Sequence, residues 1–198
     1  MGKIRLLLID FYDSFTYNIV HYIESLGPSV DVVFFDQVNI NDINHYHAII
    51  LSPGPGLPNQ KMNMNNLLNS IVESSIPVLG ICLGFQALAE FLGFELENQR
   101  TVKHGVSEEL TVYRKNSILY RDMPLKFNVG LYHSWSVKNP PNLLEIITSK
   151  SKSGVLMSIE DENEKIFGVQ FHPESILTEN GIKIFENFLH FVKENQNI

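Results

Sequence analysis

The stretch PVLGICLGFQALAEFLG, residues 77–93, contains the chain's one cysteine and two different hydrophobic patterns. Residues 77–82 form a short apolar run, which is typical of a buried strand, and the residues after Gly84 have the spacing of a helix. Cys82 lies at the junction, between Gly80 and Gly84. A strand that leads directly into a helix predicts one unit of an α/β fold.

The same alternation continues on both sides of this stretch. Apolar runs predict strands, and helical spacing predicts helices, in the order strand 4–10, helix 14–27, strand 30–35, strand 48–52 and helix 65–75. After residue 95, short alternating runs predict further strands, and a last helix is expected near 181–193. This order predicts a mainly parallel sheet with helices on both faces. We expect a single α/β domain over residues 1–198, since no linker or break in composition divides the chain.

The composition argues against several classes of protein. Hydrophobic residues make up 44% of the chain and charged residues 19%, as in globular proteins rather than disordered or membrane ones. The net charge of −7 argues against a nucleic-acid or membrane-surface partner, because phosphate binding needs clustered lysine and arginine. A single cysteine excludes an internal disulfide and a multi-thiolate metal site. The first apolar run is too short for a signal peptide, so we expect a cytoplasmic protein.

Cys82 lies where an α/β fold concentrates its chemistry. Ligands bind to such sheets at the carboxyl ends of the parallel strands, where loops and helix N-termini meet. The pattern Gly-x-Cys-x-Gly between a strand and a helix fits a nucleophile elbow, a tight turn that projects its middle side chain. The helix that follows would place partial positive charge beside the sulfur and favour the thiolate. The alternative is that Cys82 is a small buried apolar side chain.

The segment GVQFHPES, residues 168–175, offers a base for such a thiol. His172 precedes a proline, which favours an extended backbone, and residues two apart in an extended chain share a face. His172 and Glu174 therefore project together, as a Cys-His-Glu triad requires. The alternative is a histidine that caps a loop beside a solvated Glu174. A zinc deaminase also uses His-x-Glu but needs cysteines further along, and none follows Cys82, so we expect no metal.

The segment LSPGPGLP, residues 51–58, also follows an expected strand. Gly54 and Gly56 allow close backbone approach, and the prolines stiffen the loop, so that it could present an N–H group to a developing oxyanion. The N–H group of Leu83, the residue after the nucleophile, would be the second donor. Taken alone this segment is a weak signal, because Pro-Gly turns are common.

Four motifs together resemble the class I, or triad, glutamine amidotransferases. In chain order they are LSPGPG, GICLGFQ, GLYHSW and GVQFHPESILTENG, and they span nearly the whole chain. Near the start, LLLIDFYDSFTYN is similar to the glutaminase components of anthranilate synthase and of 4-amino-4-deoxychorismate synthase. The resemblance implies a flavodoxin-like α/β fold with a mixed, mostly parallel sheet flanked by helices.

The resemblance also implies a reaction and the residues that perform it. Cys82 would attack the side-chain amide of L-glutamine and release ammonia, and water would hydrolyse the thioester to glutamate. His172 would act as base and then as acid, oriented by Glu174, and no cofactor is implied. The glutamine site and the oxyanion hole would be formed by Gly54, Pro55, Gly56, Leu83, Gln86, Ser134 and Trp135, the last two through main-chain groups.

Four positions depart from the pattern usual in that family. The chain has Phe11 for asparagine, Phe85 for histidine, Val106 for lysine and Trp135 for leucine. None of these changes removes a triad member. Main-chain binding would tolerate the change at Trp135, although the indole could alter the pocket or a partner interface. We expect the other three to affect subfamily and partner contacts more than the chemistry.

The resemblance implies a second chain, because ammonia released into water would be protonated and lost. That partner would be a larger chorismate-binding synthase subunit, docked on the loop with Tyr12, Phe15 and Tyr17. Packing at a helix start is the alternative for Phe15 and Tyr17. The chain could also be a stand-alone thiol hydrolase of γ-glutamyl compounds or a non-catalytic flavodoxin-like binding module. The sequence does not separate an anthranilate from an aminodeoxychorismate product, because the synthase sets the product.

Overall fold

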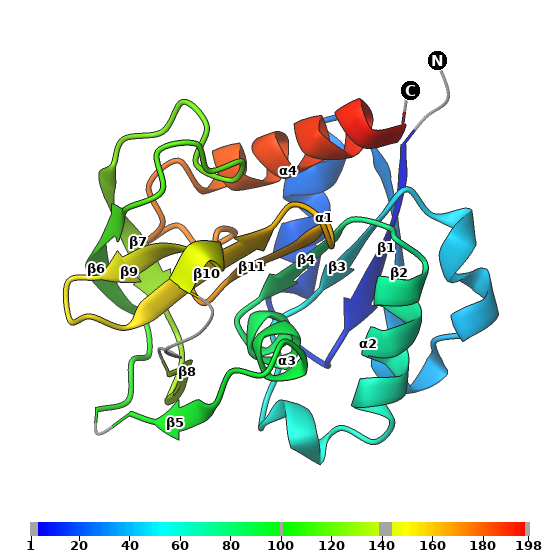
Figure 1. Ribbon diagram of the computed structural model, residues 1–198, viewed down its shortest axis with the longest axis horizontal. Helices are drawn as coiled ribbons and strands as arrows, with labels where there is room; N and C mark the ends of the chain where they lie inside the picture. The colour runs from blue at the N-terminus through cyan, green and yellow to red at the C-terminus, as the bar shows by residue number, and fades with distance from the viewer. Residues whose placement is uncertain (1–3, 100, 139–143, 197–198) are drawn as a thin grey trace.

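A computed structural model describes residues 4–99, 101–138 and 144–196, and most of its strands belong to one large sheet. The helices are α1 (Thr16–Ser25), α2 (Met64–Glu73), α3 (Leu83–Phe91) and α4 (Gly181–Gln196). The strands are β1 (Arg5–Asp10), β2 (Ser29–Phe34), β3 (Ala48–Leu51), β4 (Val78–Ile81), β5 (Leu96–Asn98), β6 (Val106–Val112), β7 (Lys126–Leu131), β8 (Trp135–Val137), β9 (Ile147–Ser151), β10 (Leu156–Asp161) and β11 (Ile166–Val169). A nine-stranded sheet has the order β2-β1-β3-β4-β11-β10-β9-β6-β7, and β5 pairs separately with β8 (Figure 1).

The large sheet is mixed. Its half with β2, β1, β3, β4 and β11 is parallel, and β10, β9, β6 and β7 pair antiparallel with their neighbours. Tight connections can join antiparallel strands, whereas parallel strands need longer crossovers such as helices. The expected α/β fold with a mixed sheet flanked by helices is confirmed. No helix in the described ranges is long and apolar enough to span a bilayer.

Strand β1 has a continuous apolar sequence because both of its faces are covered. Successive side chains of a strand point to opposite faces of the sheet. Leu6 and Leu8 pack in a core with residues of α1 and α4, and Leu7 and Ile9 pack in a second core with residues of α2 and α3. Figure 1 shows α1 and α4 on one side of the sheet and α2 and α3 on the other. Both faces of the parallel half are therefore buried.

The junction of β4 and α3 depends on two glycines that leave no room for a side chain. A Cβ atom on Gly80 would lie 2.5 Å from the backbone of Gly84. A Cβ atom on Gly84 would lie 2.4 Å from the carbonyl oxygen of Leu51, at the end of β3. The first turn of α3 is therefore pressed against the ends of β3 and β4, and Cys82 lies on the turn between them.

We expect Gly84→Ala to destabilise the protein more than Gly27→Ala. The methyl group at 84 would overlap backbone atoms that no rotamer change can move, and overpacking of this kind costs about 3 kcal/mol. Gly27 has open space around it, so that only its φ of 106° opposes alanine, at about 1 kcal/mol. Urea unfolding of the two variants measures both costs. Equal losses of stability would contradict the close contact at Gly84.

Candidate active site

Cys82 occupies a strained turn at the carboxyl end of β4. Its φ of 51° and ψ of −99° lie outside the helical and strand regions, which is costly for a residue with a side chain. The turn is held by main-chain bonds, from Cys82 N–H to the Val169 carbonyl oxygen at 2.9 Å and from Gln86 N–H to the Cys82 carbonyl oxygen at 2.9 Å. The residue is only 7% exposed. The backbone therefore has the shape of an elbow that projects the sulfur.

His172 and Glu174 form a close buried pair. Nδ1 of His172 lies 2.6 Å from Oε1 of Glu174, and both side chains are buried. Because the carboxylate can only accept, Nδ1 carries the proton of this bond. The tautomer is thus fixed with Nε2 left to exchange a proton with another group. Nε2 has no aligned hydrogen-bond partner among the residues that the structure describes.

The Cys82 sulfur is the strongest influence that favours the charged form of His172. Burial lowers the pKa of His172, but the nearby charge of Cys82, together with the hydrogen bond and charge of Glu174, raises the pKa well above its ordinary value. The thiol is thus close enough to act on Nε2, although the two are not aligned as a full hydrogen bond. Such loose geometry is common in catalytic pairs without substrate. Cys82, His172 and Glu174 therefore form one cluster.

Two aromatic rings enclose the imidazole ring of His172. The ring centroid of Tyr132 lies 4.9 Å from that of His172, and the centroid of Phe15 lies 5.7 Å away, both with edge-to-face geometry. Phe15 also contacts Tyr132, at 5.4 Å between centroids. Phe15 thus packs against the candidate base, whereas Tyr12 is 50% exposed and Tyr17 is 71% exposed.

The loop that carries His172 is fixed by contacts with β7 and with the start of α4. The N–H group of His172 donates to the Gly130 carbonyl oxygen at 3.1 Å, and the hydroxyl of Thr178 donates to the His172 carbonyl oxygen at 2.6 Å. Gly181, the first residue of α4, packs on Pro173 so closely that a Cβ atom there would overlap the proline carbonyl group. Contacts from both sides therefore fix the main chain on either side of the imidazole.

The segment 51–58 lies beside the first residue of α3. A Cβ atom on Gly54 would lie 2.9 Å from a methyl carbon of Leu83 and 2.5 Å from Cβ of Phe11, so that only glycine fits. The Ser52 carbonyl oxygen accepts from the N–H group of Gly84 at 3.2 Å. As the first residue of α3, Leu83 has an N–H group without a partner inside the helix. The two expected oxyanion donors therefore come from adjacent segments. Gly56, with a φ of 81°, closes the loop against Gln60, and Pro55 lies between the two glycines.

Gln86, Ser134 and Trp135 are brought together across 49 residues of sequence. Nε2 of Gln86 donates to the Trp135 carbonyl oxygen at 2.9 Å, and the Ser134 carbonyl oxygen accepts from the N–H group of Gln99 at 2.7 Å. The same Nε2 of Gln86 donates to Oε1 of Gln170 at 3.1 Å, and Nε2 of Gln170 lies 3.6 Å from the Cys82 sulfur. Sequence reasoning missed Gln170. The two-residue alternation that linked His172 with Glu174 also includes Gln170 and was the available signal.

Two of the four unusual residues are core residues, which corrects the expectation that they affect partner contacts. Phe11 and Phe85 are fully buried, so neither can touch a partner directly. Gly168 on β11 provides the space for Phe85, because a Cβ atom there would lie 2.6 Å from the phenyl ring. Val106 is partly exposed at the start of β6, and Trp135 is half-buried.

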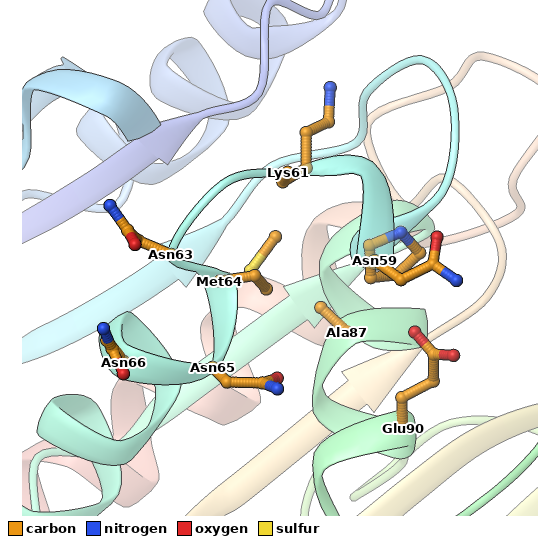
Figure 2. A pocket seen from close by; sticks show the side chains of 9 residues that line it. Asn59, Lys61, Asn63, Met64, Asn65, Asn66, Ala87 and Glu90 are labelled. Atoms are coloured by element: carbon orange, nitrogen blue, oxygen red, sulfur yellow. The ribbon is translucent and has the colours of Figure 1, made fainter.

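A hollow of about 470 Å³ lies between the start of α2 and α3 (Figure 2). Asparagine side chains line much of it, together with Lys61 and Glu90. Ala87 and Glu90, three residues apart on one face of α3, border it, and none of Cys82, Gln86, His172 and Glu174 is among the residues that line it. This hollow is therefore separate from the Cys82 cluster. Within the described ranges, no group of three or more histidine, cysteine, aspartate or glutamate side chains is placed to hold a metal ion.

Comparisons with known proteins identify the family and the fold of this chain. The chain is 39% identical over 193 residues to an anthranilate synthase component 2 from Lactococcus lactis, covering 96% of both chains. It is 36% identical over 189 residues to one from Azospirillum brasilense, covering 93% of this chain and 95% of that protein. The solved structure of a glutamine amidotransferase from Thermotoga maritima shares the fold with a TM-score of 0.75 at 19% identity, covering 98% of each chain. Residues 7–192 match the family described as glutamine amidotransferase class-I, and the chain belongs to that family.

Proposed function

We propose that this amidotransferase is a glutaminase subunit that hydrolyses L-glutamine through Cys82, His172 and Glu174 and supplies ammonia to a chorismate-using synthase. The observation that carries the proposal is the buried 2.6 Å contact between His172 and Glu174, with the imidazole acted on by a thiol on a strained turn. The relatives named as anthranilate synthase component 2 support the choice of synthase.

In the first half-reaction, the sulfur of Cys82 attacks the amide carbon of the glutamine side chain. The thiol proton moves to Nε2 of His172, and the carbonyl oxygen becomes an oxyanion. The N–H group of Leu83 and the main chain of Gly54, Pro55 and Gly56 would stabilise that charge. The carbon–nitrogen bond then breaks, and Nε2 returns the proton to the leaving nitrogen as ammonia departs.

In the second half-reaction, water replaces ammonia. His172 takes a proton from water, which attacks the thioester carbonyl carbon. The carbon–sulfur bond then breaks, Nε2 of His172 returns the proton to the leaving sulfur, and glutamate and the free Cys82 thiol result. The imidazolium is oriented by Glu174 in both halves. Gln86 and the main chain of Ser134 and Trp135 would hold the amino-acid end of the substrate.

A single domain over residues 1–198 and a cytoplasmic location remain predictions.

The partner would dock near the carboxyl ends of β1 and β2. There Tyr12 stacks on Phe34 with 4.6 Å between ring centroids, and the Tyr12 hydroxyl donates to Asp36. Tyr12, Tyr17 and Phe34 are 50%, 71% and 39% exposed, and exposed aromatic residues are enriched at protein interfaces. Tyr12 and Tyr17 follow β1 in the chain, and Phe15, which lies between them in sequence, contacts His172. A docked synthase would therefore lie close to the point where ammonia forms.

Cys82→Ser is expected to abolish the glutamine-dependent reaction of the complex while sparing synthesis from added ammonium. A serine hydroxyl is a much weaker nucleophile beside this base, so the glutamine-dependent rate should fall at least about 10³-fold. The measurement is aminated product formed from chorismate with either nitrogen source. Full activity with glutamine would remove Cys82 from the mechanism. Rapid hydrolysis of γ-glutamyl amides by the isolated chain, with no effect of a synthase, would favour the stand-alone hydrolase.

Glu174→Gln is expected to lower the pKa of His172. Glu174 is one of the groups that raise this pKa, so removing its charge lets the imidazolium lose its proton at lower pH. An NMR titration of the His172 ring gives the midpoint. Glu160→Gln is the matched control, because this buried carboxyl group instead accepts from the N–H groups of Ile118 and Leu119. Equal midpoints in wild type and Glu174→Gln would contradict the assigned pair.

Tyr17→Ser is expected to weaken the complex with the synthase about tenfold, as is usual for a central interface aromatic. Tyr113→Ser should leave the affinity for the synthase unchanged. Tyr113 is 62% exposed, but it follows β6, which lies near the opposite end of the strand order from β1 and β2. Titration calorimetry of each variant against the synthase measures the difference. If both variants bind like wild type, the docking face lies elsewhere.

A further inference from the structure

Gln170 is a fully buried polar side chain beside the sulfur, and none of the steps above uses it. It follows directly after β11, two residues before His172. Its Nε2 lies 3.6 Å from Sγ of Cys82, within hydrogen-bonding distance of a sulfur acceptor. Its Oε1 accepts from Gln86. The side-chain amide of Gln170 thus connects Cys82, the candidate nucleophile, with Gln86, a candidate substrate-binding residue.

The orientation of the Gln170 side-chain amide is set by a backbone carbonyl group, which can accept hydrogen bonds but cannot donate them. The Trp135 carbonyl oxygen can only accept, so Gln86 must turn its Nε2 toward it. The same Nε2 also donates to Gln170, which must therefore present its oxygen to Gln86 and its nitrogen to Cys82. An amide has the same shape either way round, and the hydrogen-bond network decides its orientation. The sulfur consequently meets an N–H group rather than a carbonyl oxygen.

We propose that Gln170 is a positioning residue that holds an N–H donor on the Cys82 sulfur and so favours its thiolate form. A hydrogen bond to a charged acceptor is about twice as strong as one between neutral groups, so the bond strengthens when the sulfur ionises. A carbonyl oxygen in that place would repel the thiolate. The inference rests on the proposed role of Cys82 as nucleophile and links the Trp135 main chain, through Gln86, to the sulfur.

The main chain around Gln170 is held independently of its side chain. The Gln170 N–H group donates to the Met157 carbonyl oxygen at 2.8 Å, and the preceding carbonyl oxygen, of Val169, accepts from Cys82 N–H. His172 has its own main-chain bond to Gly130. The end of β11 therefore keeps its anchors when the amide is replaced by an apolar side chain of similar length. Methionine is suited to this test because it is flexible and unbranched.

The test is the pH dependence of Cys82 alkylation by iodoacetamide. Cys82 is the chain's one cysteine, so every alkylation event reports on this sulfur. We expect Gln170→Met to react about tenfold more slowly than wild type below neutral pH and to shift the pH profile of the alkylation rate upward, as for loss of one hydrogen bond to a charged group. At high pH, where the thiolate forms in both proteins, the two rates should converge.

The control is Asn187→Leu, which removes a buried amide that bonds the carbonyl oxygens of Leu119 and Arg121. This variant should keep the wild-type profile even where it loses stability. An unchanged profile in Gln170→Met would overturn the proposal. A rate lowered equally at every pH would also overturn it, since Gln170 would then only shape access to the sulfur.

A second measurement needs no substitution at Gln170. In wild type, the NMR signals of the Gln170 side-chain NH₂ group should titrate together with the thiol, and in Cys82→Ala this titration should vanish. Signals that ignore the state of Cys82 would overturn the proposal. Neither measurement uses glutamine. A chain that passes both tests but never hydrolyses glutamine would therefore refute the proposed function while leaving the Gln170 donor intact.

Discussion

The close approach of α3 to the ends of β3 and β4 is the constraint on which the site depends. With no side chain at Gly80 or Gly84, the helix begins against the Leu51 carbonyl group, and the chain can turn within one residue. That residue is Cys82, whose strained backbone is kept by main-chain bonds on both sides. Strain of this kind persists only where the surroundings over-determine it. The packing of three core elements thereby fixes the position of one sulfur atom.

The rest of the site is brought to that atom by strand pairing. β11 pairs with β4 in parallel register, with Val169 opposite Ile81, so the residues that follow the two strands emerge side by side. The extended segment after β11 then presents Gln170, His172 and Glu174 at two-residue intervals. Contacts of Gly130, Thr178 and Gly181 hold this segment in place without using those side chains. The side chains of this segment therefore carry the chemistry, and its main chain is anchored by residues outside the segment.

The sequence could predict the local parts of this arrangement. Hydrophobic periodicity was enough to place the β4–Cys82–α3 unit, and the proline after His172 predicted its pairing with Glu174. What it missed depends on contacts between distant residues. Phe85 was expected to affect partner contacts but is buried, because Gly168 leaves space for its ring. The orientation of the Gln170 amide depends on its contacts through Gln86 with Trp135. The strand order β10-β9-β6-β7 is set by long-range pairing. No local pattern contains this information.

The charge balance of the site gives a reason for an amide, rather than a lysine or arginine, beside the sulfur. In the reactive form, the thiolate and the Glu174 carboxylate carry two negative charges against one imidazolium, and burial penalises unbalanced charge. A cation at position 170 would restore neutrality, but it would compete with the imidazolium of His172 for the thiolate and lower the pKa of His172 by repulsion. A neutral N–H group favours the thiolate without either effect. Because its orientation derives from the Trp135 main chain, the donor stays in place whatever the protonation state of the triad.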